Sequence, residues 1–199
     1  MKKKRMDAIN IIKETLKNRR PRSVKNSISH YMHAAVLIPV FLEDGGYKVL
    51  FTERSHKVEH HKGQISFPGG VIDKKDRSLE ETALRESYEE IGLLTEDVEL
   101  LGQIDEVLTV TSHFIIHPFV GRIPYPYSFI INHEEVESII TIPLQFFFDK
   151  KDHADLDGFT YRGTTYEYQD YTIWGATASI MENFIHLVGK NLCLPENVE

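Results

Sequence analysis

Three glutamates stand within five positions of the segment "RESYEE": Glu86, Glu89 and Glu90. In a helix, residues three and four apart share a face, so these carboxylates would lie side by side. Carboxylates gathered in this way repel one another and destabilise an isolated helix, whereas hard divalent cations bind clustered oxygen ligands. The spacing favours a magnesium site, although a solvated acidic stripe without metal is the usual explanation of adjacent glutamates.

The residues around this cluster predict one helix with two defined ends. Ser78 with Glu81 three positions later forms the pattern of a capping box, and Gly92 is a natural C-terminal stop. Between them, Leu84, Tyr88 and Ile91 take another face, which suits packing on a sheet. We therefore expect a helix over residues 78–91 that carries its glutamates away from the sheet.

Apolar periodicity elsewhere predicts strands with a few helices inserted between them. Helical spacing marks residues 5–18 and about 174–190, whereas residues 56–68 are polar and predict a loop. A hairpin is expected in residues 159–169, with its turn at Arg162–Gly163. Strands are expected at residues 33–43, 47–54, 98–104, 114–123 and 136–144. No repeat or linker divides the chain, so the pattern predicts one α+β domain over residues 26–199, preceded by a basic amphipathic helix and arm over 1–25.

The charge of the chain is unevenly spread. The net charge is −7, yet residues 1–25 hold ten Lys and Arg against two acids, Asp7 and Glu14. The acidic remainder argues against a broad nucleic-acid-binding face, so no nucleic-acid partner is expected. For the basic arm, contact with RNA or anionic lipid and a plain solvated helix face both stay open.

Cysteine usage and hydropathy indicate the compartment. Cys193 is the single cysteine, which excludes a disulfide framework within the chain and fits a reducing environment. No run of about 18 apolar residues occurs, so no membrane span is expected. The sequence predicts a cytoplasmic protein.

The tyrosines at positions 161, 166, 168 and 171 would line either a pocket or a homodimer contact.

Together these residues resemble the signature of the Nudix hydrolases. That signature reads Gly, five residues, Glu, seven residues, then Arg-Glu-apolar-any-Glu-Glu-any-Gly-apolar. Here Gly70 supplies the first glycine, and "RESYEEIGL" supplies the block from Arg85 to Leu93. Three departures stand out. Asp76 replaces the expected Glu, eight residues separate it from Arg85, and Ser87 occupies a usually apolar position. An acidic group at Asp76 can still pair with Arg85.

The resemblance implies a fold, a reaction and a set of roles. The fold is a mixed sheet between helices, and the reaction is hydrolysis of a nucleoside diphosphate linked to another group, with Mg²⁺ or Mn²⁺ as cofactor. Glu86 and Glu90 would be the chief metal ligands, and Glu89 a further ligand or the catalytic base. The backbone carbonyl of Gly70 would add a ligand, and Arg85 would orient a carboxylate. The motif positions with a structural role would be Gly69, Asp76 and Gly92.

A second pattern precedes the signature in "VLFTERSHKVEHHKGQISFPGG", residues 49–70. It is similar to the extra motif of Nudix coenzyme A pyrophosphatases, with Glu59 at a position where that motif has Arg. The similarity implies cleavage of coenzyme A and its thioesters into 3′,5′-ADP and (acyl-)4′-phosphopantetheine. Arg54 and Lys62 have the charge to meet phosphates, although a strand-end arginine with a purely structural role is the alternative. The substrate-binding candidates are Arg54, His61, Lys62, Gly63 and Gln64.

Two other hypotheses stay open at this stage. The same chemistry would act on ADP-ribose, dinucleoside polyphosphates or (deoxy)nucleoside triphosphates, and Glu59 keeps that alternative in play. A catalytically silent binding module is disfavoured because Arg85 and the three glutamates are all present. Outside the signature, Glu134, Glu135 and Glu137 would either reach the metal from a loop or remain solvated charges.

Overall fold

The computed structural model describes residues 7–24, 30–57, 63–109, 111–149, 164–189 and 192. Its helices are α1 (Ala8–Lys17), α2 (Leu79–Ile91), α3 (Phe146–Asp149) and α4 (Gly175–Gly189), with the 3₁₀ turn η1 (Thr95–Asp97). Its strands are β1 (Met32–Glu43), β2 (Gly46–Arg54), β3 (Ile65–Ser66), β4 (Gly69–Val71), β5 (Glu99–Gln103), β6 (Val107–Thr109), β7 (Phe114–Arg122), β8 (Val136–Pro143), β9 (Tyr166–Tyr168) and β10 (Tyr171–Ile173). The hairpin expected at Arg162–Gly163 has its turn outside the described residues.

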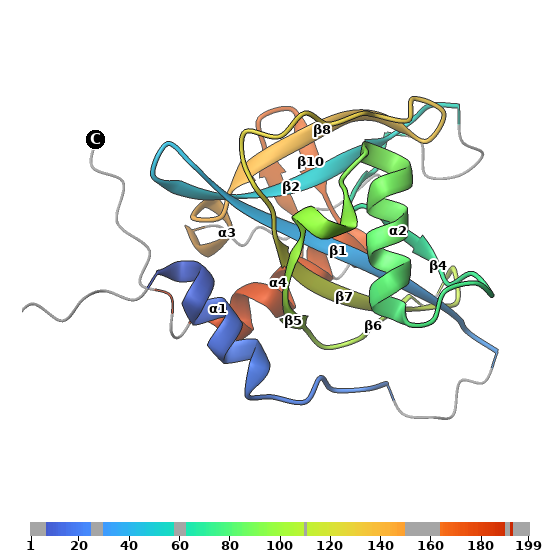
Figure 1. Cartoon of the computed structure of the whole chain (residues 1–199), viewed down its shortest axis with the longest axis horizontal. Helices are drawn as coiled ribbons and strands as arrows, with labels where there is room; N and C mark the ends of the chain where they lie inside the picture. The colour runs from blue at the N-terminus through green and yellow to red at the C-terminus, as the bar shows by residue number, and fades with distance from the viewer. Residues whose placement is uncertain are drawn as a thin grey trace, which may run out of the picture.

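The long strand β1 is the centre of an eight-stranded mixed sheet (Figure 1). It runs parallel to β7 on one side, and on the other side it pairs antiparallel with β2 at its end and with β4 near its start. Strand β8 lies antiparallel on β2, and β5 and β6 lie antiparallel on β7. The register places Ala35 opposite Gly70 and Val36 opposite Gly69, so the sheet itself carries the glycines that precede the acidic helix.

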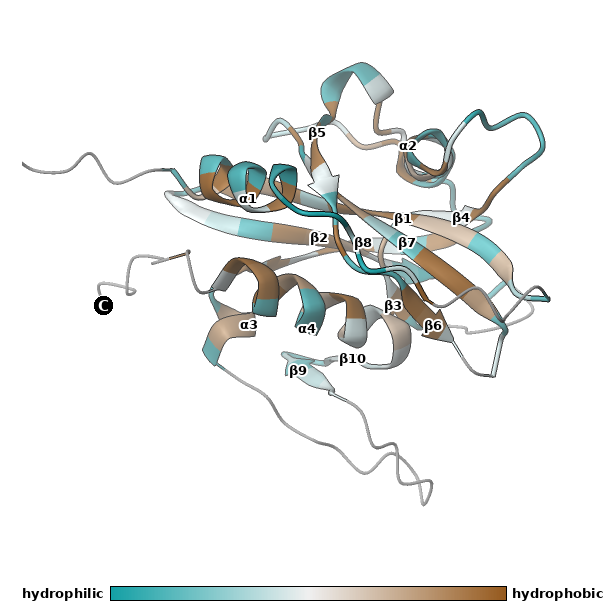
Figure 2. Ribbon diagram, turned by 90° about the horizontal axis from the view of Figure 1, so that it is seen from below, coloured by the Kyte–Doolittle hydropathy of each residue, from teal (hydrophilic) through white to brown (hydrophobic). Residues whose placement is uncertain are grey.

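Helices cover both faces of this sheet (Figure 2). On one face, α2 buries Ala83 and Ile91 against Leu37 and Phe41 of β1. On the other face, α3 and α4 close a larger core in which Phe147 of α3 is packed. The predicted α+β architecture, a mixed sheet between helices, is confirmed.

The N-terminal helix packs into the domain core. Ile9, Ile12 and Leu16 of α1 are buried and belong to the core that α4 closes. A β-carbon on Gly102 of β5 would come within 2.7 Å of the Leu16 side chain, so the glycine allows the helix to lie directly on the strand. The predicted helix is present as Ala8–Lys17, flanked by Asp7 and Asn18, and residues 5 and 6 of the expected range lie outside the described residues. The division at residue 25 stays a prediction.

One part of the expected loop over residues 56–68 is wrong. Ile65 and Ser66 form β3, which pairs with Thr52 and Glu53 of β2. A strand of two residues carries no periodicity, so only its distant partner identifies it. Within the described residues, no helix is both long and apolar enough to cross a membrane.

Candidate active site

The acidic helix α2 begins and ends where its sequence predicts. Ser78 Oγ accepts a hydrogen bond from the backbone N–H of Glu81 at 3.2 Å. The carboxylate of Glu81 accepts from the N–H of Arg77 at 2.6 Å, one residue earlier than a reciprocal capping box requires. At the other end, Gly92 has φ 68° and donates its N–H to the Tyr88 carbonyl at 2.9 Å. Both ends of the glutamate-bearing helix are therefore fixed by local bonds.

The two glycines of β4 bring the chain close to the acidic face of α2. A β-carbon on Gly70 would lie 2.5 Å from the carboxyl carbon of Glu86. A β-carbon on Gly69, which has φ 155°, would lie 2.4 Å from the Ala35 carbonyl oxygen. The N–H of Gly69 donates to Glu90 Oε2 at 3.3 Å. Only glycine at these positions allows Glu86 and Glu90 to rest on the loop backbone.

Glu86 and Glu90 form an acidic pair, named the buried pair below, in which Glu90 is buried and Glu86 is partly exposed. The Glu90 residue is 5% exposed, and burial together with the neighbouring charge of Glu86 raises its pKa to about 8. Burial also raises the pKa of Glu86, against the opposing effect of Arg85. Two neighbouring carboxylates are costly to bury in a low dielectric when their negative charge is only partly offset. A bound cation would offset the rest of that charge.

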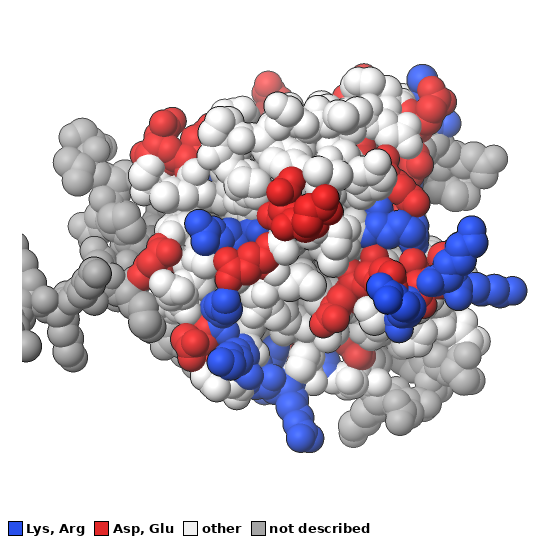
Figure 3. Space-filling model, in the orientation of Figure 1, with Lys and Arg blue, Asp and Glu red and all other residues white. Residues whose placement is uncertain are grey.

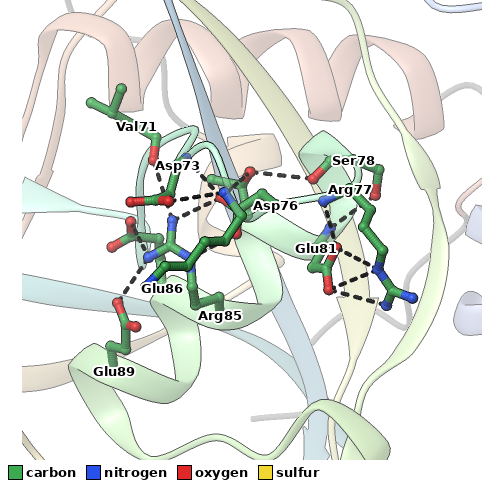
Figure 4. A network of polar contacts seen from close by, with 11 residues as sticks. Val71, Asp73, Asp76, Arg77, Ser78, Glu81, Arg85, Glu86 and Glu89 are labelled. Carbon is green, nitrogen blue, oxygen red and sulfur yellow. Dashed lines mark hydrogen bonds and ion pairs between the residues drawn. The ribbon is translucent and has the colours of Figure 1, made fainter.

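Arg85 connects three carboxylates along α2 (Figure 4). Its Nε and Nη2 each donate to Asp76 at 2.9 Å, a two-pronged arrangement. Its Nη1 lies 2.8 Å from Glu86 Oε1 and 2.8 Å from Glu89 Oε2. Arg85 thus faces carboxylates of its own chain, and Glu89 is the most exposed of the signature glutamates.

Asp76 occupies the expected acidic position despite its shorter side chain and the extra residue. A turn closes on it, because the Asp76 N–H donates to the Asp73 carbonyl at 3.0 Å while the Asp73 N–H donates to Asp76 Oδ2 at 2.9 Å. Thr82 Oγ1 adds a bond at 2.9 Å. The Arg85 guanidinium holds the pKa of Asp76 well below its ordinary range. The loop therefore absorbs the insertion and keeps the ion pair.

Ser87, the third departure from the signature, is buried on the sheet side of α2. Its Oγ donates to the Ala83 carbonyl at 2.7 Å, which satisfies the hydroxyl within the helix. Of the acids outside the signature, Glu135 lies near enough for its negative charge to add to the rise in the pKa of both Glu86 and Glu90, which burial mainly causes. Glu134 is instead paired with Lys57 at 2.7 Å.

Arg54 approaches the acidic pair from the end of β2. Its positive charge acts on Glu90 and opposes the rise in the pKa of that carboxyl. Within the described residues its Nε is buried without a hydrogen-bond partner. The backbone carries Gly63 and Gln64 beside it, since the Arg54 N–H donates to the Gln64 carbonyl and the Gly63 N–H donates to the Arg54 carbonyl, both at 3.0 Å. The other candidates of this segment, Glu59, His61 and Lys62, lie outside the described residues.

The donors present fit a hard divalent cation. Glu86, Glu90 and Glu135 would supply carboxylate oxygens, and the absence of a side chain at Gly70 makes room for the Glu86 carboxyl group. In the described part of the chain, no three acidic, histidine or cysteine side chains already stand as a complete cation site. Glu89 is turned toward Arg85 and Glu90 toward the Gly69 N–H, so both carboxylates are engaged by the protein.

The surface over this region mixes both signs of charge. Acidic and basic side chains lie side by side over α2 and the loop before it (Figure 3). Arg77 and Glu81 form an exposed pair there, with Nε and Oε2 3.0 Å apart. Among the described residues, this face therefore carries no surface of a single sign around the site.

Comparison with known proteins agrees with the fold and with the signature. The family model described as the NUDIX domain matches residues 31–160. The chain belongs to the Nudix family. "Uncharacterized Nudix hydrolase NudL" of Photorhabdus laumondii is 36% identical over 172 residues, which cover 84% of this chain and 91% of that relative. The protein of the same description from Yersinia enterocolitica is 38% identical over 160 residues, which cover 78% of this chain and 81% of that relative.

Solved Nudix structures share the architecture at low sequence identity. The Nudix hydrolase RenU from M. smegmatis matches with TM-score 0.59 and 16% identity, covering 83% of this chain and 91% of that one. The MutT protein from Methanosarcina mazei matches with TM-score 0.54 and 18% identity, covering 81% and 95%. These likenesses establish the Nudix fold. The chain is therefore a Nudix hydrolase by family, and hydrolases of this family generally use divalent metal ions.

Proposed function

We propose that this Nudix protein hydrolyses the pyrophosphate bond of coenzyme A and its thioesters, with Mg²⁺ or Mn²⁺ as cofactor. The observation that carries the proposal is the buried pair Glu86–Glu90 seated on Gly70, with Arg54 beside it. Carboxylates beside a guanidinium suit a diphosphate bound together with a cation, because the carboxylates would bind the cation and the guanidinium a phosphate. The coenzyme A assignment rests on the similarity of residues 49–70 to the motif of that subgroup.

Glu86 and Glu90 would hold the cation, with Glu135 and the Gly70 carbonyl as further donors. A cation bound there supplies positive charge that offsets the diphosphate and favours attack of water on phosphorus. Glu89 would be the base that takes a proton from that water, because its side chain is more exposed than those of Glu86 and Glu90, while Arg85 holds one of its oxygens. Arg85 sets the direction of Glu89 and Glu86 and holds Asp76 behind them.

Arg54 would bind a phosphate of the substrate. Its buried Nε lacks a protein partner within the described residues. A guanidinium can donate two parallel hydrogen bonds to the oxygens of a phosphate, so a phosphate would satisfy this donor. Gly63 and Gln64 would line the same approach, because their backbones are bonded to that of Arg54. His61 and Lys62 stay predictions for substrate binding.

One assay distinguishes the candidate substrates. The protein is incubated with Mg²⁺ or Mn²⁺ and equal concentrations of coenzyme A, acetyl-coenzyme A, ADP-ribose, diadenosine polyphosphates or deoxynucleoside triphosphates, and products are identified by mass spectrometry. We expect 3′,5′-ADP and 4′-phosphopantetheine from coenzyme A at the highest kcat/KM. A preference for ADP-ribose or a dinucleotide would replace the coenzyme A assignment by the alternative, and turnover of none would favour a silent binding module.

Location and assembly follow as predictions. A cytoplasmic location fits the single cysteine and a metabolite substrate. A homodimer stays a prediction that light scattering of the purified protein tests directly.

A further inference from the structure

Asn132 lies where the segment between β7 and β8 meets the C-terminal end of α2. Its backbone N–H and carbonyl and its side-chain Oδ1 and Nδ2 all form hydrogen bonds, to α2 or to the residues that follow it. We infer that Asn132 is a positioning residue that holds Glu135 against the acidic pair, an inference that rests on the proposed function. Nothing in the signature marks this residue, because it lies 40 positions beyond Gly92.

The backbone of Asn132 is fixed to the acidic helix. Its N–H donates to the Glu90 carbonyl at 2.9 Å, and the Ile130 N–H donates to the Ile91 carbonyl at 3.0 Å. The last carbonyls of a helix have no intrahelical donor, so this segment satisfies two of them. The position of Asn132 is thereby tied to the residue whose side chain belongs to the buried pair.

The rest of Asn132 organises the turn that carries Glu135. Its carbonyl accepts from the N–H groups of Glu135 at 3.0 Å and Val136 at 2.9 Å, and its Oδ1 accepts from the N–H of Glu134 at 3.2 Å. Its Nδ2 donates to Glu135 Oε1 at 3.2 Å. The Glu135 carbonyl is held in turn by the Ser55 N–H at 2.9 Å, next to Arg54. Glu135 is therefore fixed at both its backbone and its carboxylate.

The chemistry of the donor matters for a carboxylate that is to face a cation. A lysine or arginine at position 132 would orient Glu135 but would also cancel its charge, whereas a neutral amide orients it and leaves the charge available. The charge of Glu135 already acts on Glu86 and Glu90 across the site. Asn132 thus links the main chain of the helix to a third carboxylate without competing with the cation.

The test measures Mn²⁺ binding by electron paramagnetic resonance, together with kcat for the best substrate of the panel. Asn132→Asp keeps the size and the Oδ1 acceptor but replaces the donor by a second negative charge, and Asn132→Ala removes both side-chain bonds. We expect the apparent Kd for Mn²⁺ to rise about 10-fold in Asn132→Ala, as is typical when a group that orients a metal ligand is lost. Glu96→Gln, a substitution of an exposed acid on η1, serves as the charge control and should leave that Kd unchanged.

A double-variant cycle decides whether Asn132 acts through Glu135. In a Glu135→Ala background, Asn132→Ala should cause no further change in Kd for Mn²⁺ or in kcat. An equal change in both backgrounds, or no change in either, would overturn the inference. Thermal denaturation identifies a variant that has lost its fold. If Asn132→Ala is such a variant, the same cycle is measured with Asn132→Asp and the same outcomes decide. Failure of the proposed function looks different, since the wild-type protein would then not hydrolyse coenzyme A in the substrate panel, whether or not Asn132→Ala changes the Kd for Mn²⁺.

Discussion

The carboxyl carbon of Glu86 lies 2.5 Å from the place where a β-carbon on Gly70 would stand. A methyl group there must displace the end of a flexible side chain, which costs little stability but moves a candidate metal ligand. Gly70→Ala should therefore lower kcat by about 10- to 100-fold, the range expected when a reacting group shifts by roughly 1 Å. Activity assays and thermal denaturation check both parts. Gly46→Ala is the matched control, because the nearest atom there is 3.7 Å away. Wild-type kcat in Gly70→Ala would mean that Glu86 has no functional role in the site.

Glu90→Gln should stabilise the metal-free protein and abolish its response to metal. The carboxyl is 5% exposed beside Glu86, and a neutral amide of the same shape can still accept the Gly69 N–H. We expect a gain of roughly 1–3 kcal/mol in the free energy of unfolding without metal. Saturating Mg²⁺ should raise the Tm of wild type but not of the variant, and kcat should fall by about 100-fold or more. Glu96→Gln, an exposed acid on η1, controls for net charge. A variant with a wild-type response to Mg²⁺ contradicts the ligand role.

Asp76→Asn should weaken the fold through Arg85. The Asp76 side chain is 3% exposed and that of Arg85 is 27% exposed, so Asp76→Asn removes the two-pronged partner of Arg85 and leaves its Nε and Nη2 without a charged acceptor, while Nη1 keeps Glu86 and Glu89. Urea denaturation should show a loss of about 2 kcal/mol in the free energy of unfolding. Arg77→Gln removes an exposed ion pair on the same loop and should leave stability close to wild type. Equal effects of the two substitutions would mean that burial of Asp76 is unimportant.

His117 should make stability depend on pH below neutrality. The residue is 5% exposed, with His33 Nδ1 2.9 Å from its Nε2 and Glu106 Oε1 3.5 Å from its Nδ1. Burial lowers the pKa of His117 from its ordinary 6.5, although Glu106 opposes the shift. The unfolded chain therefore binds more protons, and this contribution to stability is complete above pH 6.5 and is lost as the pH falls toward the folded pKa.

Urea denaturation of wild type and His117→Gln between about pH 7.5 and 5 tests whether stability falls on acidification. This range brackets the pKa of an unperturbed histidine. The variant, neutral throughout, should lose less stability on acidification than wild type. His186→Gln replaces an exposed histidine on α4 and should follow wild type. Parallel curves for all three proteins would show that His117 titrates as it does in the unfolded chain.

The sequence allows prediction of those parts of the site that local chemistry determines. Ser78 and Gly92 mark the two ends of α2 by their own hydrogen bonds, and the spacing of Glu86 and Glu90 places them on one helical face. The pairing of Asp76 with Arg85 is likewise expected from charge, despite the inserted residue. These features depend on residues within about one or two turns of one another.

Features that depend on distant partners escaped prediction. In the run "NHEEVE" the acids look alike, and Glu135 is distinguished by its bond to Asn132, whose N–H is bonded to the Glu90 carbonyl 42 positions away. Strand β3 is recognised only by its pairing with β2. The contact of His33 with His117 joins β1 to β7 across 84 positions. No periodicity in a single segment carries this information.

The pairing of β8 with β2 also bears on the order of events during synthesis. Arg54 leaves the ribosome long before its neighbour Val136, and the acidic helix is complete before β7 can join β1. Contacts of such high sequence separation form late, because the intervening chain must first be ordered. Until β7 and β8 have been made, the nascent polypeptide carries its glutamates without the finished sheet beneath them. The geometry of the candidate site therefore depends on strands that are made after the helix that carries its glutamates.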